Sequence, residues 1–265
     1  MRTPVKTELE SHTQTFYRDA LEVLEQSGIP YLVGGAYALR AYTGIHRHTR
    51  DFDVFLRPAD CRRALDFFAA RGYPSELTYP HWLGKCRRGD DYVDLIFSSG
   101  NGIATVDDAW FERAEKGVVF DRAVRLCPPE EMIWSKGYIM ERERFDGADV
   151  AHLIRARGAD LDWDHLTRRF RPHPHVLLVQ ILLFEFVYPE QRGVVPERIR
   201  RELLGAIQAE AAGPARERPV CRGTLLSRSQ YLVDLERGYL DARLAPFGPL
   251  DPEQLERWTA EAQSL

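Results

Sequence analysis

The sequence predicts an α+β domain over residues 1–127, followed by a C-terminal helical domain over residues 128–265. Two observations indicate this order. Before Pro128, short apolar runs with period-two alternation are mixed with helical patterns. After Pro128, apolar residues recur with the period of 3.6 that is typical of helices alone. Strands mixed with helices, followed by helices alone, are typical of an α+β domain with a separate helical domain.

The elements of the first domain follow from periodicity and from turn residues. A helix is expected over residues 9–26, because its apolar positions have near-helical spacing and Gly28 and Pro30 follow it. The stretches YLVGG and DFDVFL predict strands, and AYALRAYTG and PADCRRALDFFAARG predict helices. Further strands are expected around SELTY, HWLGKCRR and YVDLIFSS, and the stretch VVFDRAVRLC predicts a hairpin that turns near Asp121 and Arg122.

The second domain is expected to consist of helices. They are predicted in PPEEMIWSKGYIMERER, DGADVAHLIRARG, DWDHLTRRF, HVLLVQILLFEFVY and PERIRRELLGAIQAE. The apolar run VLLVQILLFEFVY contains Gln180 and Glu185 and is too short to span a bilayer, so we expect it to be the core helix of this domain. The stretch AAGPARERP predicts an exposed loop.

Composition limits the classes of function. The 265 residues carry a formal net charge of −4, which provides no overall basic field for long nucleic acids. The four cysteines stand far apart, which is typical of reduced thiols rather than of a disulfide framework or a zinc site. The N-terminus lacks the apolar stretch of a signal peptide. We therefore expect a cytoplasmic protein with no membrane partner.

Three aspartates lie within otherwise apolar strand patterns. Asp51 and Asp53 are two residues apart, so their side chains point to one face of a strand with Cα atoms about 7 Å apart. Asp94 lies on a later strand, with Val93 and Leu95 on the opposite face. On neighbouring strands, the three acids would repel one another by roughly 3 kcal/mol per pair at about 6 Å and an effective dielectric constant of 20. A bound cation is therefore expected, and Mg²⁺ suits carboxylates that share it with substrate phosphates.

Two glycines at the end of the first strand suit the same chemistry. Gly34 and Gly35 allow backbone N–H groups to approach a triphosphate, and the positive end of the next helix would point there. Two Mg²⁺ ions about 4 Å apart can hold the attacking and leaving oxygens of an in-line phosphoryl displacement. A Gly-Gly pair alone is a weak signal, whereas its combination with the spaced acids is far more specific.

The ordered motifs VGG, DFD and VDL resemble the polymerase-β-type nucleotidyltransferase superfamily, in particular its small bacterial stand-alone members. Arg47 and Thr49, which precede Asp51, match the R-x-T-x-D-x-D form of such members, and PPEEMIWSKGYIMERERFDGADVAHLI is similar to the helical segment that follows their core. The resemblance covers roughly the first 155 residues. It implies a nucleotidyltransferase fold with a mixed β-sheet flanked by helices, two Mg²⁺ ions, and transfer of a nucleoside monophosphate from a nucleoside triphosphate such as ATP.

The resemblance also implies roles for individual residues. Asp51 and Asp53 would ligate the metal ions, and Asp94 would hold one ion and favour deprotonation of the acceptor hydroxyl. Gly34 and Gly35 would cradle the phosphates. The further candidates for nucleotide binding are Arg47, Thr49, Lys85, Arg87 and Lys136.

The resemblance leaves the acceptor open among a small molecule, a protein and an RNA end. Small stand-alone members include antibiotic-modifying enzymes and toxins of toxin–antitoxin pairs, and a toxin would have an antitoxin-type protein as its partner. One alternative is a non-catalytic module that uses this fold to bind a nucleotide or a partner. Another is a magnesium-dependent phosphodiesterase or nuclease, for which the expected histidines beside the acids are missing. His46 and His48 are interpreted as part of a solvated loop rather than as metal ligands.

Overall fold

The computed structural model describes residues 10–47, 49, 51–214 and 217–260. By their internal contacts, the described residues form two compact units. The first unit comprises the chain up to Gly100 together with Thr105–Pro128. The second comprises Asn101–Ala104 and the chain from Pro129 onward.

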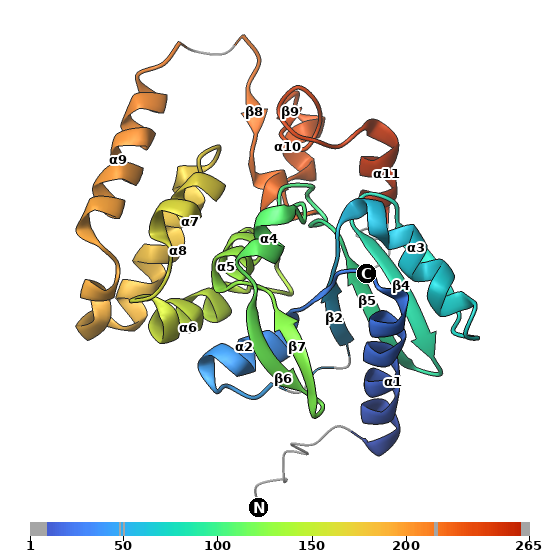
Figure 1. The fold of residues 1–265 in the computed structure, drawn as a ribbon. Helices are drawn as coiled ribbons and strands as arrows, with labels where there is room; N and C mark the ends of the chain where they lie inside the picture. Colours follow the sequence, from blue (N-terminus) through green and yellow to red (C-terminus); the bar gives the residue numbers. More distant parts are fainter. Residues whose placement is uncertain (1–9, 48, 50, 215–216, 261–265) are drawn as a thin grey trace, which may run out of the picture. The chain divides into compact units, whose positions relative to one another are not determined.

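The first unit is built on a seven-stranded mixed sheet with the order β3-β4-β5-β2-β1-β7-β6 (Figure 1). Strand β2 runs antiparallel to β1 and parallel to β5, and β1 runs parallel to β7. The strands are β1 (Leu32–Val33), β2 (Asp51–Phe55), β3 (Ser75–Tyr79), β4 (Leu83–Arg88), β5 (Asp91–Ile96), β6 (Glu115–Val119) and β7 (Arg122–Leu126). The predicted α+β class with a mixed sheet flanked by helices is confirmed.

Four helices accompany this sheet: α1 (Ser11–Ser27), α2 (Gly35–Thr43), α3 (Pro58–Ala69) and α4 (Asp108–Glu112). Helices α1 and α3 contact each other and also β5 and β3–β4, respectively, while α2 contacts β2. The sequence analysis missed α4, a helix of five residues that is too short to show a helical period. Its signal was the Asp-Asp pair at its start, because the Asp107 side chain accepts a hydrogen bond from the Ala109 N–H at 3.1 Å.

An aromatic cluster holds β2 in place on the face opposite its aspartates. Phe52 is fully buried, and its ring centroid lies 5.0 Å from that of Tyr17 on α1 and 5.2 Å from that of Tyr37 on α2. Phe120, at the turn between β6 and β7, lies 5.8 Å from Phe52. Aromatic pairs at these distances contribute beyond their buried area. The cluster therefore ties two helices and a hairpin to the strand that carries Asp51 and Asp53.

The second unit contains the predicted helices, together with structure that the sequence analysis did not predict. Its helices are α5 (Pro129–Gly137), α6 (Gly147–Arg157), α7 (Trp163–Arg169), α8 (Pro174–Val187), α9 (Glu197–Ala211), α10 (Leu232–Glu236) and α11 (Pro252–Ala260), with the 3-10 turns η1 (Pro189–Val194) and η2 (Gly223–Leu225). Strands β8 (Val220–Cys221) and β9 (Leu240–Asp241) form a short parallel pair. No helix among the described residues is both long enough and apolar enough to cross a membrane.

Helix α5 ends earlier than the sequence predicted. The expected helix continued through Arg144, but α5 stops at Gly137 and the next segment turns back on itself. The Met140 N–H donates to the Leu226 carbonyl at 3.0 Å, and the Glu141 N–H donates to the Arg144 carbonyl at 2.8 Å. Long-range pairing of these backbone groups replaces the helical hydrogen bonds, which helical propensity alone does not reveal.

Helix α8 lies where a core helix of the second unit was predicted, but only one of its faces is covered. One face is buried, with Leu177, Ile181 and Phe184 fully enclosed. Phe186 is 84% exposed and Leu182 is 52% exposed, so the apolar run continues across the open face. Apolar composition identified the helix correctly but could not tell which face is covered.

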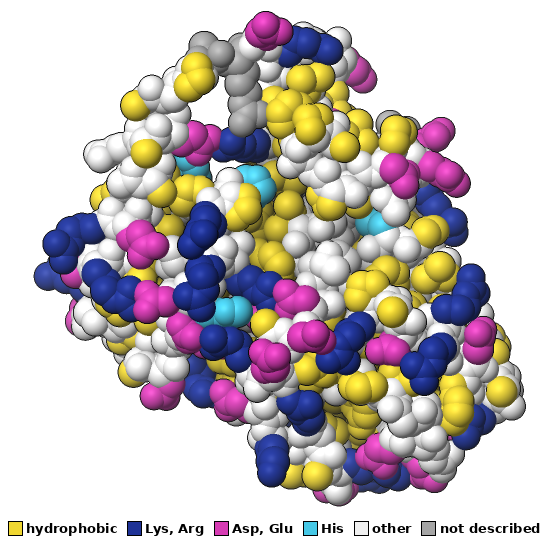
Figure 2. All heavy atoms as spheres, turned by 45° about the horizontal axis from the view of Figure 1, so that its top comes forward, with side chains coloured by type: hydrophobic (Ala, Val, Ile, Leu, Met, Phe, Trp, Pro, Cys, Tyr) yellow, Lys and Arg dark blue, Asp and Glu magenta, His cyan; other side chains and the backbone are white. Residues whose placement is uncertain are grey.

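Several charged side chains on the surface form ion pairs. On the face shown in Figure 2, Lys and Arg side chains lie among Asp and Glu side chains. In the first unit, Arg122 bridges Glu22 and Glu25 at 2.9 and 2.7 Å, and Arg88 lies 2.7 Å from Asp19. Such exposed pairs each contribute only about 0–1 kcal/mol, so they shape the surface field more than the stability.

The aromatic cluster supports a stability prediction. Phe52→Ala is expected to lower the free energy of unfolding of the first unit by about 3–5 kcal/mol, because it leaves a cavity among packed rings. Val118→Ala is the control: Val118 is 72% exposed, and its loss is expected to stay within about 0.5 kcal/mol. The measurement is urea unfolding followed by tryptophan fluorescence. Equal midpoints for the two variants would contradict the role of the cluster.

Candidate active site

Both glycines between β1 and α2 are required by close contacts. The Gly34 N–H donates to the Asp53 carbonyl at 3.0 Å, and a Cβ atom on Gly34 would lie 2.4 Å from the Phe55 ring. Gly35 has a φ of +53°, and its Cβ would lie 1.7 Å from Asp53 Oδ2. A side chain at either position would collide with β2, so only glycine allows the start of α2 to approach the aspartates.

Asp51, Asp53 and Asp94 come together on two parallel strands. The register of β2 and β5 pairs Asp53 with Asp94 and Asp51 with Tyr92. One carboxylate oxygen from each of the three aspartates lies within 4.8 Å of the others. Among the described residues this is the one group of three or more acidic, histidine or cysteine side chains whose geometry suits a metal ion. The site joins the strand that follows the short helix with the later strand.

The environment of Asp94 differs from that of a surface acid. Asp94 is 8% exposed, and burial raises its pKa above the ordinary value, with the negative charge of Asp51 acting in the same direction. Lys85 opposes this effect, because its Nζ lies 2.9 Å from Asp94 Oδ1. The Lys85 ammonium also lies 4.1 Å from the centroid of the Tyr92 ring. Lys85 is therefore a direct counter-charge to the buried acid of the cluster, and Arg87 acts on the pKa of Asp94 in the same direction.

The carboxylates fit a divalent cation of the magnesium type. Three oxygen donors within 4.8 Å of one another form the hard ligand set that Mg²⁺ prefers, and the glycine at Gly35 keeps the space beside Asp53 Oδ2 free of a side chain. Asp51 is held by the Thr49 hydroxyl, which donates to its carboxylate. The ligands are thus prepositioned by hydrogen bonding and by strand pairing.

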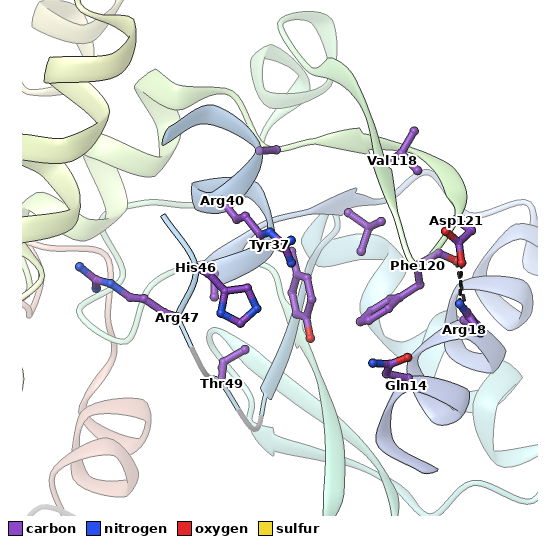
Figure 3. Close-up of a pocket in the computed structure, with 13 residues that line it drawn as sticks. Gln14, Arg18, Tyr37, Arg40, His46, Arg47, Thr49, Val118, Phe120 and Asp121 are labelled. Atoms are coloured by element: carbon purple, nitrogen blue, oxygen red, sulfur yellow. Dashed lines mark hydrogen bonds and ion pairs between the residues drawn. The ribbon is translucent and has the colours of Figure 1, made fainter. Parts of the chain in front are cut away.

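The predicted nucleotide-binding side chains are in different situations. Thr49 braces Asp51, and Arg47 and Thr49 both line a pocket in the first unit (Figure 3). Arg87, two residues beyond Lys85 on β4, forms an ion pair with Glu76 at 2.8 Å. Lys136 belongs to the second unit.

Lys136 is enclosed by acids of its own unit. Its Nζ lies 2.7 Å from Asp146 Oδ2 and 2.9 Å from Asp149 Oδ2. Arg144 also donates to Asp146 at 3.0 Å, and these partners hold the pKa of Asp146 at about 2 despite its burial. Binding of a phosphate by Lys136 stays a prediction. A phosphate would have to compete with the ion pairs that Lys136 forms with Asp146 and Asp149.

Two residues of α2 were not predicted from the sequence, namely Tyr37 and Arg40, which line the pocket. The Tyr37 hydroxyl is buried and has no hydrogen-bond partner among the described residues. Burial raises its pKa, with smaller contributions from Asp51 and Asp53. Arg40 lies one turn further along α2 and lines the same pocket. Their spacing of three residues on the short helix was the signal that could have identified them.

The chain was compared with known proteins. No protein-family profile and no curated protein matches the sequence. Similar solved structures include the antibiotic-resistance factor ANT(2'')-Ia, which is 17% identical with a TM-score of 0.41, the match covering 77% of this chain and 97% of that one. The lincosamide antibiotic adenylyltransferase LnuA is 17% identical with a TM-score of 0.40, over 55% of this chain and 98% of that one.

A third similar structure is an antigenic nucleotidyltransferase-like protein from Paracoccidioides brasiliensis. It is 16% identical with a TM-score of 0.45, and the match covers 70% of this chain and 93% of that one. At such low identities, the functional conclusion rests on the residues of the site itself.

The charge cluster generates a prediction about stability without metal. Asp51→Asn is expected to raise the melting temperature in EDTA, because it removes one of three like charges while the amide oxygen still accepts from Thr49. A gain on the order of 1 kcal/mol would correspond to a few degrees. Added Mg²⁺ should stabilise the wild type more than the variant. A variant that melts below the wild type in EDTA would contradict repulsion at this site.

The close contact at Gly35 generates a second prediction, with a matched control. Gly35→Ala and Gly72→Ala both place alanine at a positive φ, which costs roughly 1–2 kcal/mol in each case. The Cβ of the Gly72 variant meets open space, whereas that of the Gly35 variant meets Asp53. Thermal melting should show a larger loss for Gly35→Ala, together with loss of the Mg²⁺-dependent shift. Identical behaviour of the two variants would show that Gly35 serves the backbone alone.

Proposed function

We propose that the protein is a magnesium-dependent nucleotidyltransferase, which moves a nucleoside monophosphate from a nucleoside triphosphate onto a hydroxyl group. The observation that carries this proposal is the juxtaposition of Asp51, Asp53 and Asp94 with the glycine-lined start of α2. Acids of this number and spacing hold divalent cations, and backbone N–H groups at a helix start bind phosphate. The two features meet at one edge of β2, where Gly34 donates to Asp53.

Asp51, Asp53 and Asp94 would hold the two metal ions. When bound, Mg²⁺ neutralises phosphate charge and supports an in-line displacement between the attacking and leaving oxygens. Gly34 and Gly35 leave room for the donor phosphates beside the metal ligands. The aromatic cluster beneath β2 keeps the ligands rigid, which a phosphoryl-transfer site requires because its catalysis depends on positioning.

The proposed transfer needs no reactant other than the nucleoside triphosphate and the acceptor hydroxyl. The acceptor oxygen forms a bond to the α-phosphorus of the donor, and the bond from that phosphorus to the bridging oxygen breaks. Pyrophosphate leaves, and the acceptor hydroxyl loses its proton. Asp94 is the carboxylate that would favour this loss, since it is the most buried of the three and adjoins Lys85.

Three further properties of the protein are proposed from the sequence alone. The donor would be ATP, the location would be the cytoplasm, and a toxin would have an antitoxin-type protein as its partner. A genomic neighbour that encodes a small antitoxin-like protein would support the last of these.

The experiment that tests this function is pyrophosphate release from ATP, GTP, CTP and UTP, with and without Mg²⁺, in the presence of a panel of acceptors. Asp53→Asn is expected to lower the rate by more than about 100-fold, because even residues that only support metal ligands cost 10–100-fold. Asp90→Asn is the control, since Asp90 is an exposed acid in the turn between β4 and β5.

Three outcomes separate the alternatives. Magnesium-dependent release that Asp53→Asn abolishes and Asp90→Asn preserves supports the transferase. Nucleotide binding without release supports the non-catalytic module. Cleavage of a phosphodiester with no use of a triphosphate supports the phosphodiesterase.

A further inference from the structure

A cavity of about 870 Å³ lies in the first unit (Figure 3). It is lined by one face of α2, the N-terminal half of α1, the segment before β2 and the hairpin of β6 and β7. Its volume lies within the range of 300–1,000 Å³ that is typical of small-molecule sites. The three aspartates are not among its lining residues, so the cavity is an addition to the metal site.

Two residues connect this cavity to the reaction centre. Thr49 lines the cavity and donates its hydroxyl hydrogen to the Asp51 carboxylate. Ala36 also lines it and directly follows Gly35, whose Cα lies against Asp53. A molecule bound in the cavity would therefore lie next to the metal ligands, as an acceptor must.

The charges of the cavity wall favour an anion. Among the described residues, Arg18, Arg40 and Arg47 line it, against Asp121 as the one acid. Arg18 forms an ion pair with Asp121 at 2.5 Å, which neutralises both (Figure 3). Among the described residues, the Arg40 guanidinium has no hydrogen-bond or ion-pair partner. An arginine without a counter-charge in the wall of a cavity is suited to bind a phosphate group through its planar array of donors.

We propose that the acceptor is a small phosphate-bearing molecule, such as a sugar phosphate or a nucleoside monophosphate, whose phosphate is bound by Arg40. This inference rests on the proposed function. The same wall disfavours a cationic acceptor, since an ammonium group would meet an excess of arginines.

The donor triphosphate is the other source of phosphate at this site. The structure favours the acceptor, because Gly34, Gly35 and the metal ligands already provide a place for the donor phosphates outside the cavity lining. Arg40 lies on the face of α2 that lines the cavity, as do Ala36 and Tyr37. It does not lie at the start of the helix, which is at Gly35. Donor and acceptor would thus use two parts of the same helix.

The first arm of the test measures binding to the full chain by calorimetry. The probes are ribose 5-phosphate, glucose 6-phosphate and AMP, each compared with its parent ribose, glucose or adenosine. At least one phosphorylated probe is expected to bind ten or more times more tightly than its parent. Arg40→Gln should remove this preference. Arg62→Gln is the matched control, because Arg62 is also an exposed helical arginine without a hydrogen-bond or ion-pair partner among the described residues, but it lies outside the cavity.

The outcomes of this arm decide between the two sources of phosphate. Equal affinity for every phosphorylated probe and its parent would overturn the inference. Arg40→Gln should change the affinity for a nucleoside triphosphate with Mg²⁺ by less than twofold. A tenfold loss of triphosphate affinity instead would assign Arg40 to the donor and overturn its role in acceptor binding.

The second arm measures pyrophosphate release with the same probes and with an aminosugar as a cationic acceptor. A preference for the phosphorylated acceptors that Arg40→Gln lowers at least tenfold supports the inference. Turnover that prefers the aminosugar or a neutral parent would refute the inference and leave the proposed function intact. Binding of a phosphorylated probe through Arg40 with no turnover of any triphosphate would refute the proposed function and leave a phosphate site in the cavity.

Discussion

The parallel pairing of β2 with β5 is the constraint on which the site depends. It sets Asp53 opposite Asp94, and Asp51 completes a group of three carboxylates within 4.8 Å. Repulsion of roughly 3 kcal/mol per pair would spread such acids apart if β2 were free to move. The buried face of the same strand prevents this, because Phe52 is packed among rings from two helices and a hairpin. Stability contributed by the core is thus used to hold an arrangement that is unfavourable without a cation.

Local patterns were enough to predict the elements that build the site. Period-two alternation identified β2 and β5, and it placed Asp51 and Asp53 on one face of a single strand. Glycines followed by a helical pattern identified the start of α2. The strand order and the register between β2 and β5 were not predictable in this way, because they depend on contacts between residues about 40 apart in the chain.

Features that depend on long-range partners were missed. Helix α5 stops at Gly137 because the following backbone bonds elsewhere, including with Leu226. The open face of α8 depends on which neighbours cover that helix, and an apolar sequence does not specify them. Arg40 was missed for a similar reason, since its importance lies in its lack of an ion-pair partner among the described residues, while Asp121, the acid in the cavity wall, is paired with Arg18. A sequence shows which charges exist, but only a fold shows which of them are paired.

The pairing of Lys85 with Asp94 gives this lysine a role with and without the cation that we propose for the site. Without a cation, Lys85 forms an ion pair with Asp94, the most buried of the three acids, at 2.9 Å. A divalent cation at these ligands would supply the same counter-charge at closer range, so the attraction that holds Lys85 to Asp94 would fall. The lysine could then turn to phosphate oxygens, the role that its position near the VDL motif predicts. A residue that stabilises the empty site and the loaded site in turn needs the long, flexible side chain that lysine has and arginine's rigid fork lacks.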